Sequence, residues 1–155
     1  MADATINLSG DLTSSTQSDS SGSYQFPDLP ASGSYIVTPS KNALFAGSPG
    51  INTVDIVATQ RHFLNVAPIP FGCRLSAADV NGDTSVNTID VVAIQRFFLG
   101  LSTGTANVGK YQFNPASRAY PGVTVSETNQ DYGALIFGDV VAPFVQRPVE
   151  LTEYR

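Results

Sequence analysis

The stretch Asp79-Val-Asn-Gly-Asp-Thr-Ser-Val-Asn-Thr-Ile-Asp90 decides how the rest of the chain is interpreted. Oxygen-bearing side chains stand at its positions 1, 3, 5, 9 and 12, and the residue at position 7 can offer its backbone carbonyl. Three of these side chains are carboxylates, which repel one another in a tight loop unless a cation lies between them. The spacing therefore predicts a loop that surrounds Ca²⁺ with oxygen atoms. The predicted metal ligands are Asp79, Asn81, Asp83, Ser85, Asn87 and Asp90.

This spacing resembles that of an EF-hand calcium loop, with two departures. Asp90 stands at position 12, where Glu is usual, so its shorter side chain must come closer to bind through both oxygens. Thr84 stands at position 6, where Gly is usual, and a β-branched residue disfavours positive φ. The alternative interpretation is a polar turn, rich in Asn and Asp, that caps a helix without metal.

A helix is predicted directly after the loop, and its sequence occurs twice. Residues 87–100 have the pattern of a helix whose first turn supplies Asp90 and whose end is marked by Gly100. Residues 52–65, which lie 35 residues earlier, are identical at nine of the fourteen aligned positions. The chain therefore contains an internal duplication of a loop–helix unit.

The first copy lacks most of the predicted ligands. The positions that correspond to the first three side-chain ligands hold Leu44, Ala46 and Ser48. Only Asn52 and Asp55 remain from the ligand set. Either this copy binds no metal, or it forms a second, weak site through these two residues and the backbone carbonyls of residues 47–50. Asp55 also has a role without metal, as an acid in the first turn of a helix.

The tandem loop–helix units over residues 42–102 resemble the dockerin family, the calcium-binding modules of secreted bacterial proteins. The resemblance implies a protein partner of the cohesin type. In dockerins, two loop positions before the last ligand and a basic position lower on the helix contact that partner. Near-identity of the two copies implies two binding orientations related by a pseudo-twofold axis. The corresponding residues are Thr53, Val54, Thr88, Ile89, Arg61 and Arg96. The two arginines are alternatively solvated cations at helix C-termini.

The sequence on either side of this pair predicts β-structure. Alternation of apolar and polar residues between Pro- and Gly-rich turns predicts strands over residues 4–9, 24–26 and 35–38. The sequence of residues 22–41, GSYQFPDLPASGSYIVTPSK, resembles the B-type repeats of collagen adhesins and the carboxypeptidase regulatory-like domains, which are β-sandwiches of bacterial surface proteins. The continuation of that pattern comes about 70 residues later, at residues 111–125 and 131–137.

Neither β segment is large enough to close a core by itself, and each would leave sheet edges exposed. The predicted fold is therefore α+β, a split Ig-like (prealbumin-like) β-sandwich formed by residues 1–40 and 106–140. The EF-hand or dockerin-like helical pair, residues 41–105, is inserted between its strands. Residues 141–155 are interpreted as a tail or linker strand. The alternative is three separate domains.

Composition narrows the classes of function. The chain has 155 residues and a net charge of −5 without a basic cluster, which argues against nucleic acid as a partner. No apolar run approaches the ~18 residues of a membrane span. The N-terminus has neither the positive region nor the apolar region of a secretion leader. Cys73 is the only cysteine, so no intrachain disulfide forms, and we expect a buried or inert thiol. His62, the only histidine, corresponds to Phe97 in the duplicate, and no catalytic motif is found, so we expect no enzyme activity.

These observations predict a non-catalytic calcium-binding module outside the cell or at its surface, with one Ca²⁺ site and the second in question. Calcium would rigidify the helical pair because a ligand that binds only the folded form stabilises it. Three roles stay open. The module docks to a cohesin-like receptor, or copies of it assemble into a filament or tube as a homopolymer, or it is a passive C-terminal module of a secreted carbohydrate-active enzyme or adhesin.

Overall fold

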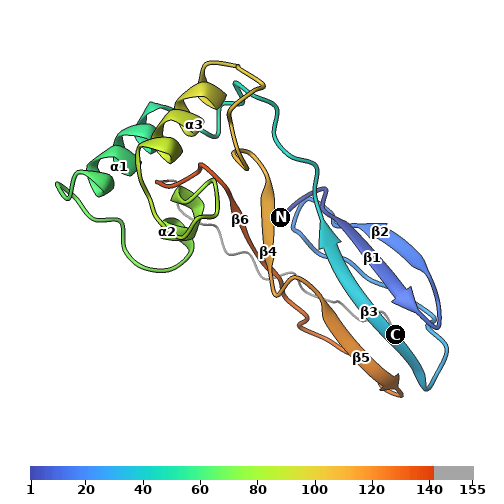
Figure 1. Cartoon of the computed structure of the whole chain (residues 1–155). Coiled ribbons are helices and arrows are strands. Elements are labelled where there is room, and N and C mark those ends of the chain that lie inside the picture. Colours follow the sequence, from blue (N-terminus) through green and yellow to red (C-terminus); the bar gives the residue numbers. More distant parts are fainter. Residues whose placement is uncertain (142–155) are drawn as a thin grey trace. The chain divides into compact units, whose positions relative to one another are not determined.

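The computed structural model describes residues 1–141 and shows a mixed α/β chain with antiparallel sheets and three helices (Figure 1). The strands are β1 (Thr5–Gly10), β2 (Ser14–Gln17), β3 (Gly33–Ser40), β4 (Tyr111–Asn114), β5 (Arg118–Val123) and β6 (Gly133–Ile136), and the helices are α1 (Thr53–Phe63), α2 (Cys73–Ala78) and α3 (Thr88–Phe98). No helix in this part of the chain is long and apolar enough to cross a membrane. The tail or linker strand predicted over residues 141–155 lies, apart from its first residue, outside the described residues.

The described chain divides into two compact units. The β unit consists of residues 1–41 and 113–134, and the helical unit consists of residues 42–112 and 135–141. Residues 106–112 and 135–140 therefore group with the helices, although the sequence prediction placed them in the β-sandwich. The reason is apolar packing, because Val140 is buried in the same cluster as the buried residues of α3.

The β unit is built on a four-stranded antiparallel sheet in the order β2-β1-β3-β5 (Figure 1). Side chains alternate between buried and exposed along the whole of β3, as the period of a strand requires. Leu8 of β1 lies opposite Val37 of β3, and both are buried. The core of this unit consists of Ala4, Ile6, Leu8, Tyr24, Tyr35, Val37 and Tyr132. This arrangement is compatible with a β-sandwich, and β4 and β6 pair in a separate two-stranded sheet.

The structure differs from the sequence prediction of the strands in two places. Residues 24–26 form no strand, since Tyr24 is buried by packing and its hydroxyl donates to the backbone oxygen of Gln130 at 3.1 Å. β2 was not predicted, because its sequence of Ser, Thr and Gln carries no apolar alternation, and its pairing with β1 decides its conformation.

The helical unit contains the two duplicated helices, α1 and α3, with the short helix α2 between them in sequence (Figure 1). α3 begins after the N-cap Asn87 and is followed by Gly100 at φ 77°, as the sequence predicts. α1 begins after Asn52 in the same way and is followed by Asn65 at φ 55°. At both C-termini the two residues after the cap donate their N–H groups back to the last turn, which is the Schellman arrangement. The core of this unit consists of Ile51, Ile69, Ala78, Val80, Ala93, Ile94, Phe97, Val108 and Val140.

Candidate metal centre

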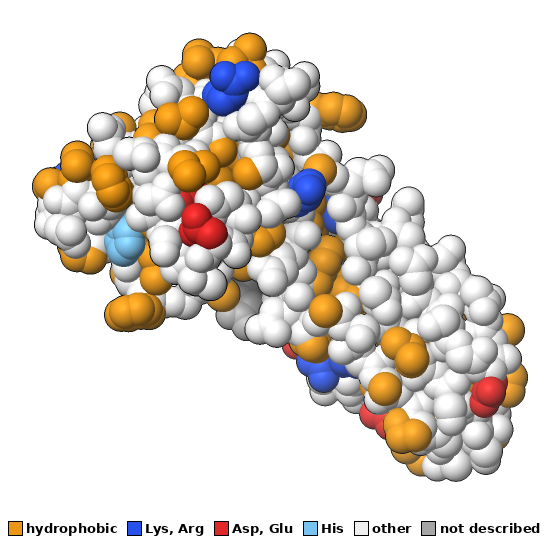
Figure 2. Space-filling model, in the orientation of Figure 1, with side chains coloured by type: hydrophobic (Ala, Val, Ile, Leu, Met, Phe, Trp, Pro, Cys, Tyr) orange, Lys and Arg blue, Asp and Glu red, His pale blue; other side chains and the backbone are white. Residues whose placement is uncertain are grey.

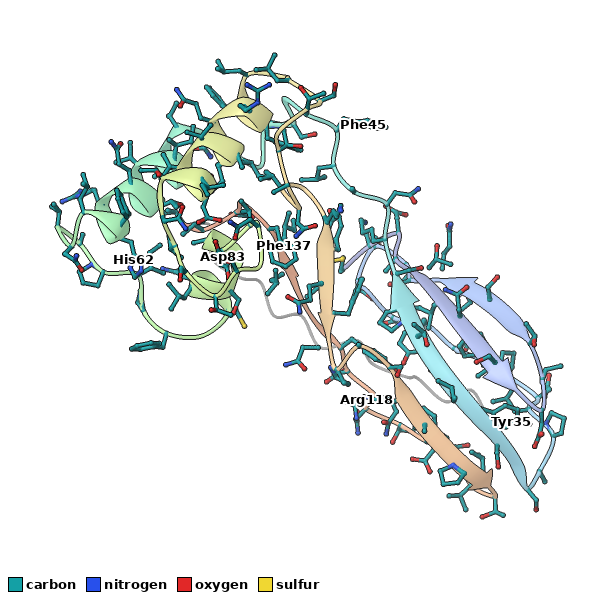
Figure 3. The ribbon with its side chains drawn as sticks, viewed as in Figure 1. Tyr35, Phe45, His62, Asp83, Arg118 and Phe137 are labelled. Atoms are coloured by element: carbon teal, nitrogen blue, oxygen red, sulfur yellow. The ribbon has the colours of Figure 1, made fainter. Side chains whose placement is uncertain are left out.

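The loop between α2 and α3 carries the predicted ligands, and Asp83 on it is labelled in Figure 3. The carboxylate of Asp79 accepts three backbone N–H groups of the loop. Its Oδ1 accepts the N–H groups of Gly82 and Asp83 at 2.9 and 3.2 Å, and its Oδ2 accepts that of Thr84 at 2.9 Å. To bring these donors to one carboxylate, Gly82 and Thr84 adopt positive φ values of 75° and 70°. Thr84 thus occupies the left-handed conformation that its β-branched side chain disfavours.

Polar groups of three predicted ligands converge at the exposed carboxylate of Asp83. The Nδ2 atom of Asn81 lies 2.8 Å from Asp83 Oδ2, and that of Asn87 lies 3.5 Å from the same oxygen. The Asn81 amide, together with the N–H of Ser85, holds the pKa of Asp83 below its usual value, so this side chain remains anionic. The amide oxygens of Asn81 and Asn87 accept the N–H groups of Asp83 and Ile89 at 3.0 and 2.8 Å, and each keeps a second lone pair. Both amides are therefore able to present oxygen to a cation from their positions beside Asp83.

Asp90 is different, because it is fully buried and bonded to the backbone. Its Oδ1 accepts the N–H groups of Val80 and Asn81 at 2.9 and 3.3 Å, and its Oδ2 accepts that of Asn87 at 2.9 Å. An ionised carboxylate has about four lone-pair sites, and three are used here. Binding of a metal through both oxygens of Asp90 would break one of these bonds. A contact through Oδ2 alone would keep all three bonds, and bidentate binding stays a prediction.

The fit of the loop to calcium depends on a mixed set of oxygen donors. Within residues 1–141, no three His, Cys, Asp or Glu side chains are grouped so that they could hold a metal ion. The loop offers two Asn side-chain oxygens and the carbonyl of Ser85 beside its carboxylates, and each of its three aspartates keeps at least one lone-pair site. Oxygen ligands of these types are those that Ca²⁺ prefers, so the residues present fit this ion.

The first repeat uses Asp55 as the second repeat uses Asp90. Asp55 is 1% exposed, and its Oδ1 accepts the N–H groups of Val140 and Val141 at 2.9 and 3.0 Å. Its Oδ2 accepts the N–H of Asn52 at 3.0 Å, and Asn52 Oδ1 in turn accepts that of Val54 at 2.8 Å. Both residues of the predicted second, weak metal site are thus engaged with the backbone. These bonds account for a buried carboxylate without a metal.

Val140 and Val141 are the residues of this centre that the sequence prediction missed. A signal exists in retrospect, because Asp139-Val140-Val141 is similar to Asp79-Val80-Asn81. Val140 and Val80 are 2% and 0% exposed and belong to the same core. Residues 140–141 therefore donate their backbone N–H groups to Asp55, as residues 80–81 at the start of the second loop donate theirs to Asp90.

The predicted partner-binding residues lie at the surface of the helical unit, with one exception. Val54 and Ile89 are 56% and 59% exposed, and Thr53 and Thr88 beside them are exposed. Figure 2 shows hydrophobic side chains distributed over the visible face of this unit. Arg61 is also exposed, whereas Arg96 is half-buried and donates from Nε and Nη2 to the carbonyl and hydroxyl oxygens of Thr103 at 2.7 and 3.2 Å.

Two other predictions concern side chains outside the loop. Cys73 is exposed and unpaired within the described part of the chain, so of the expected alternatives a buried thiol is wrong, and an inert thiol stays a prediction. His62 is half-buried, and its Nδ1 accepts the N–H of Ile69 at 2.9 Å. This bond holds the connection that leads from α1 towards α2, which is a structural role. Comparison of the chain with protein-family models, with curated proteins and with solved structures finds no match.

Proposed function

We propose that this chain is a non-catalytic extracellular module in which Ca²⁺, bound by the loop before α3, rigidifies a duplicated helical pair that docks to another protein. The observation that carries the proposal is the convergence on Asp83 of neighbours that are themselves spaced as calcium ligands. The amides of Asn81 and Asn87 already lie beside this carboxylate, and each amide oxygen, which accepts one backbone N–H, keeps a second lone pair for a cation.

Each predicted ligand has a defined part in this proposal. Asp79 and Asp83 supply charge, Asn81 and Asn87 supply amide oxygens, and Ser85 supplies its carbonyl. Asp90 supplies one oxygen while its remaining lone-pair sites keep the backbone of the loop in place. The bound ion would supply the positive charge that offsets repulsion among the carboxylates.

The finer description of the fold is part of the same proposal. The β unit is a split Ig-like sandwich, and the helical unit is an insert of the dockerin type. Support comes from the chain order, since residues 1–41 and 113–134 form one unit although most of the helical unit lies between them in sequence. The extracellular location rests on the sequence resemblances to dockerins and to adhesin repeats.

Docking is supported by the equal exposure of equivalent residues in the two repeats. Val54 and Ile89 differ by only a few per cent in exposure, and so do Val57 and Val92, at 48% and 50%. Exposed apolar side chains arranged in matching pairs provide a partner with the same contacts in two orientations. Sedimentation of the protein with and without calcium distinguishes a module that docks to another protein, which stays monomeric, from one that polymerises.

The test is calcium-dependent stability. Urea unfolding followed by helical circular dichroism is measured in EDTA and in calcium at about a hundredfold excess over Kd, where linkage predicts a gain of about 2.7 kcal/mol. Asp83→Ala should remove this gain, whereas Ser48→Ala, the equivalent position of the first repeat, should keep it. Calorimetry should give one ion per chain. Identical unfolding curves in EDTA and calcium would overturn the proposal.

A further inference from the structure

A hollow of about 210 Å³ lies in the helical unit, between α1, residues 67–70 of the following connection, the start of α2 and residues 140–141. Arg61 lines it from the last turn of α1, and Arg74 lines it from the first turn of α2. The remaining lining residues are alanine, proline, isoleucine and valine, and no acidic residue is among them. Two cationic side chains therefore line an otherwise apolar hollow.

Neither guanidinium has a partner within the described residues. No hydrogen bond or ion pair joins the guanidinium group of Arg61 or Arg74 to another residue of 1–141. The duplicate of Arg61 shows the opposite situation, because Arg96 is bonded to Thr103 through Nε and Nη2. The equivalent arginines of the two repeats therefore differ. Arg96 is hydrogen-bonded to Thr103, whereas Arg61 lines the hollow together with Arg74 and its guanidinium is unpaired within residues 1–141.

We propose that this hollow is a binding site for an oxyanion, held between the guanidinium groups of Arg61 and Arg74. A guanidinium offers a planar fork of N–H donors that matches the oxygens of carboxylate, sulfate and phosphate groups. An anion between two arginines removes their mutual repulsion and fills donors that are otherwise exposed only to water. The apolar lining lowers the local dielectric and strengthens these charge-assisted bonds.

The size of the hollow limits the ligand to a small anionic group. A volume of about 210 Å³ accommodates a sulfate or phosphate ion, or the terminal carboxylate of a side chain or peptide together with the atoms next to it. This site is separate from the proposed calcium loop and does not depend on calcium. It is therefore tested in EDTA, where failure of the calcium proposal has no effect on the result.

The experiment is a titration of the ¹⁵N-labelled chain with sodium sulfate, phosphate or acetate at constant ionic strength, followed by the arginine Nε–H signals. We expect saturable shifts at Arg61 and Arg74 and none at Arg96, whose Nε is already bonded. The order of affinities of the three anions distinguishes a tetrahedral oxyanion from a carboxylate as the preferred ligand. Shifts that grow linearly with anion concentration without saturation, or that are equal at Arg61, Arg74 and Arg96, would overturn the proposal.

Variants give an independent measurement of the same site. Arg61→Gln and Arg74→Gln should each weaken the tightest of the three anions about tenfold, which corresponds to loss of one charge-assisted interaction. Arg61→Lys, which keeps the charge but not the fork, should weaken binding less. Arg96→Gln is the matched control and should leave the affinity unchanged. Backbone amide spectra establish that each variant is folded, and equal affinity in all of them would contradict the site.

Discussion

The two repeats of the helical unit have nearly the same helix and different surroundings. In both, an Asn caps the helix and an Asp in the first turn is buried with three backbone N–H groups on its carboxylate. In the second repeat two of these donors come from the adjoining loop, at Val80 and Asn81. In the first they come from Val140 and Val141, about 85 residues along the chain.

The buried Asp, and not the loop, is therefore the constant element of this duplication. Phe45 stands in the first repeat where Val80 stands in the second, yet it is 87% exposed whereas Val80 is fully buried, and Figure 3 shows it projecting from the ribbon. The first loop therefore does not deliver its own donors to Asp55. A buried carboxylate without donors is costly, so a remote segment with a similar sequence supplies them.

The strongest test of this comparison is removal of the negative charge from each buried Asp. Asp55→Asn should lower the free energy of unfolding of the helical unit by about 3 kcal/mol, because the new amide group faces backbone donors that need an acceptor. Asp90→Asn should cost a similar amount in EDTA. The measurement is urea unfolding followed by circular dichroism. A loss below about 1 kcal/mol in either variant would break the equivalence of the two aspartates.

A smaller effect is expected from the N-caps. Asn52→Ala and Asn87→Ala should each cost about 1 kcal/mol in EDTA, because each side chain accepts a helical N–H at 2.8 Å. In calcium the second variant should lose additional stability, since Asn87 is also a proposed ligand. Equal losses with and without calcium for both variants would indicate that Asn87 only caps the helix.

Relief of backbone strain in the second loop should have a still smaller effect of opposite sign. Thr84→Gly should stabilise the unit by about 0.5 kcal/mol, because glycine adopts φ 70° without a steric penalty but gains entropy in the unfolded chain. Thr88→Gly, in the first turn of α3, is the control and should destabilise it. Thermal unfolding in EDTA compares the two, and a loss of stability in Thr84→Gly would show that the loop is not strained there.

The smallest expected effect is a change in pH dependence that only the second repeat should show. The pKa of Asp83 lies below its usual value of 3.8, chiefly because the Asn81 side chain donates to it. The ionised group therefore contributes stability that is complete above pH 3.8 and is lost as pH falls through the lowered pKa. Asp83→Asn should reduce the slope of stability against pH in that acidic range. Ser48→Ala, at the matching position, should leave the slope unchanged, and an unchanged slope in Asp83→Asn would contradict the assignment.

The sequence alone indicated the duplicated helices and their ends because these depend on neighbouring residues. An Asn cap with an Asp three residues later, and Gly100 after the last turn, act within a few residues and are visible in the order of amino acids. The spacing of oxygen side chains in the second loop is local in the same sense. The likeness of Asp139-Val140 to Asp79-Val80 was also visible, but nothing local connects it to Asp55.

Only the tertiary structure decided which groups meet across the chain. It brought Val140 and Val141 to Asp55, made a strand of β2 by pairing it with β1, and left Arg61 beside Arg74 while its duplicate is bonded to Thr103. The physical reason is the same in each case. Caps, turns and ligand spacing depend on short-range bonds, whereas burial of a polar group requires a partner whose position is set by packing of the whole unit.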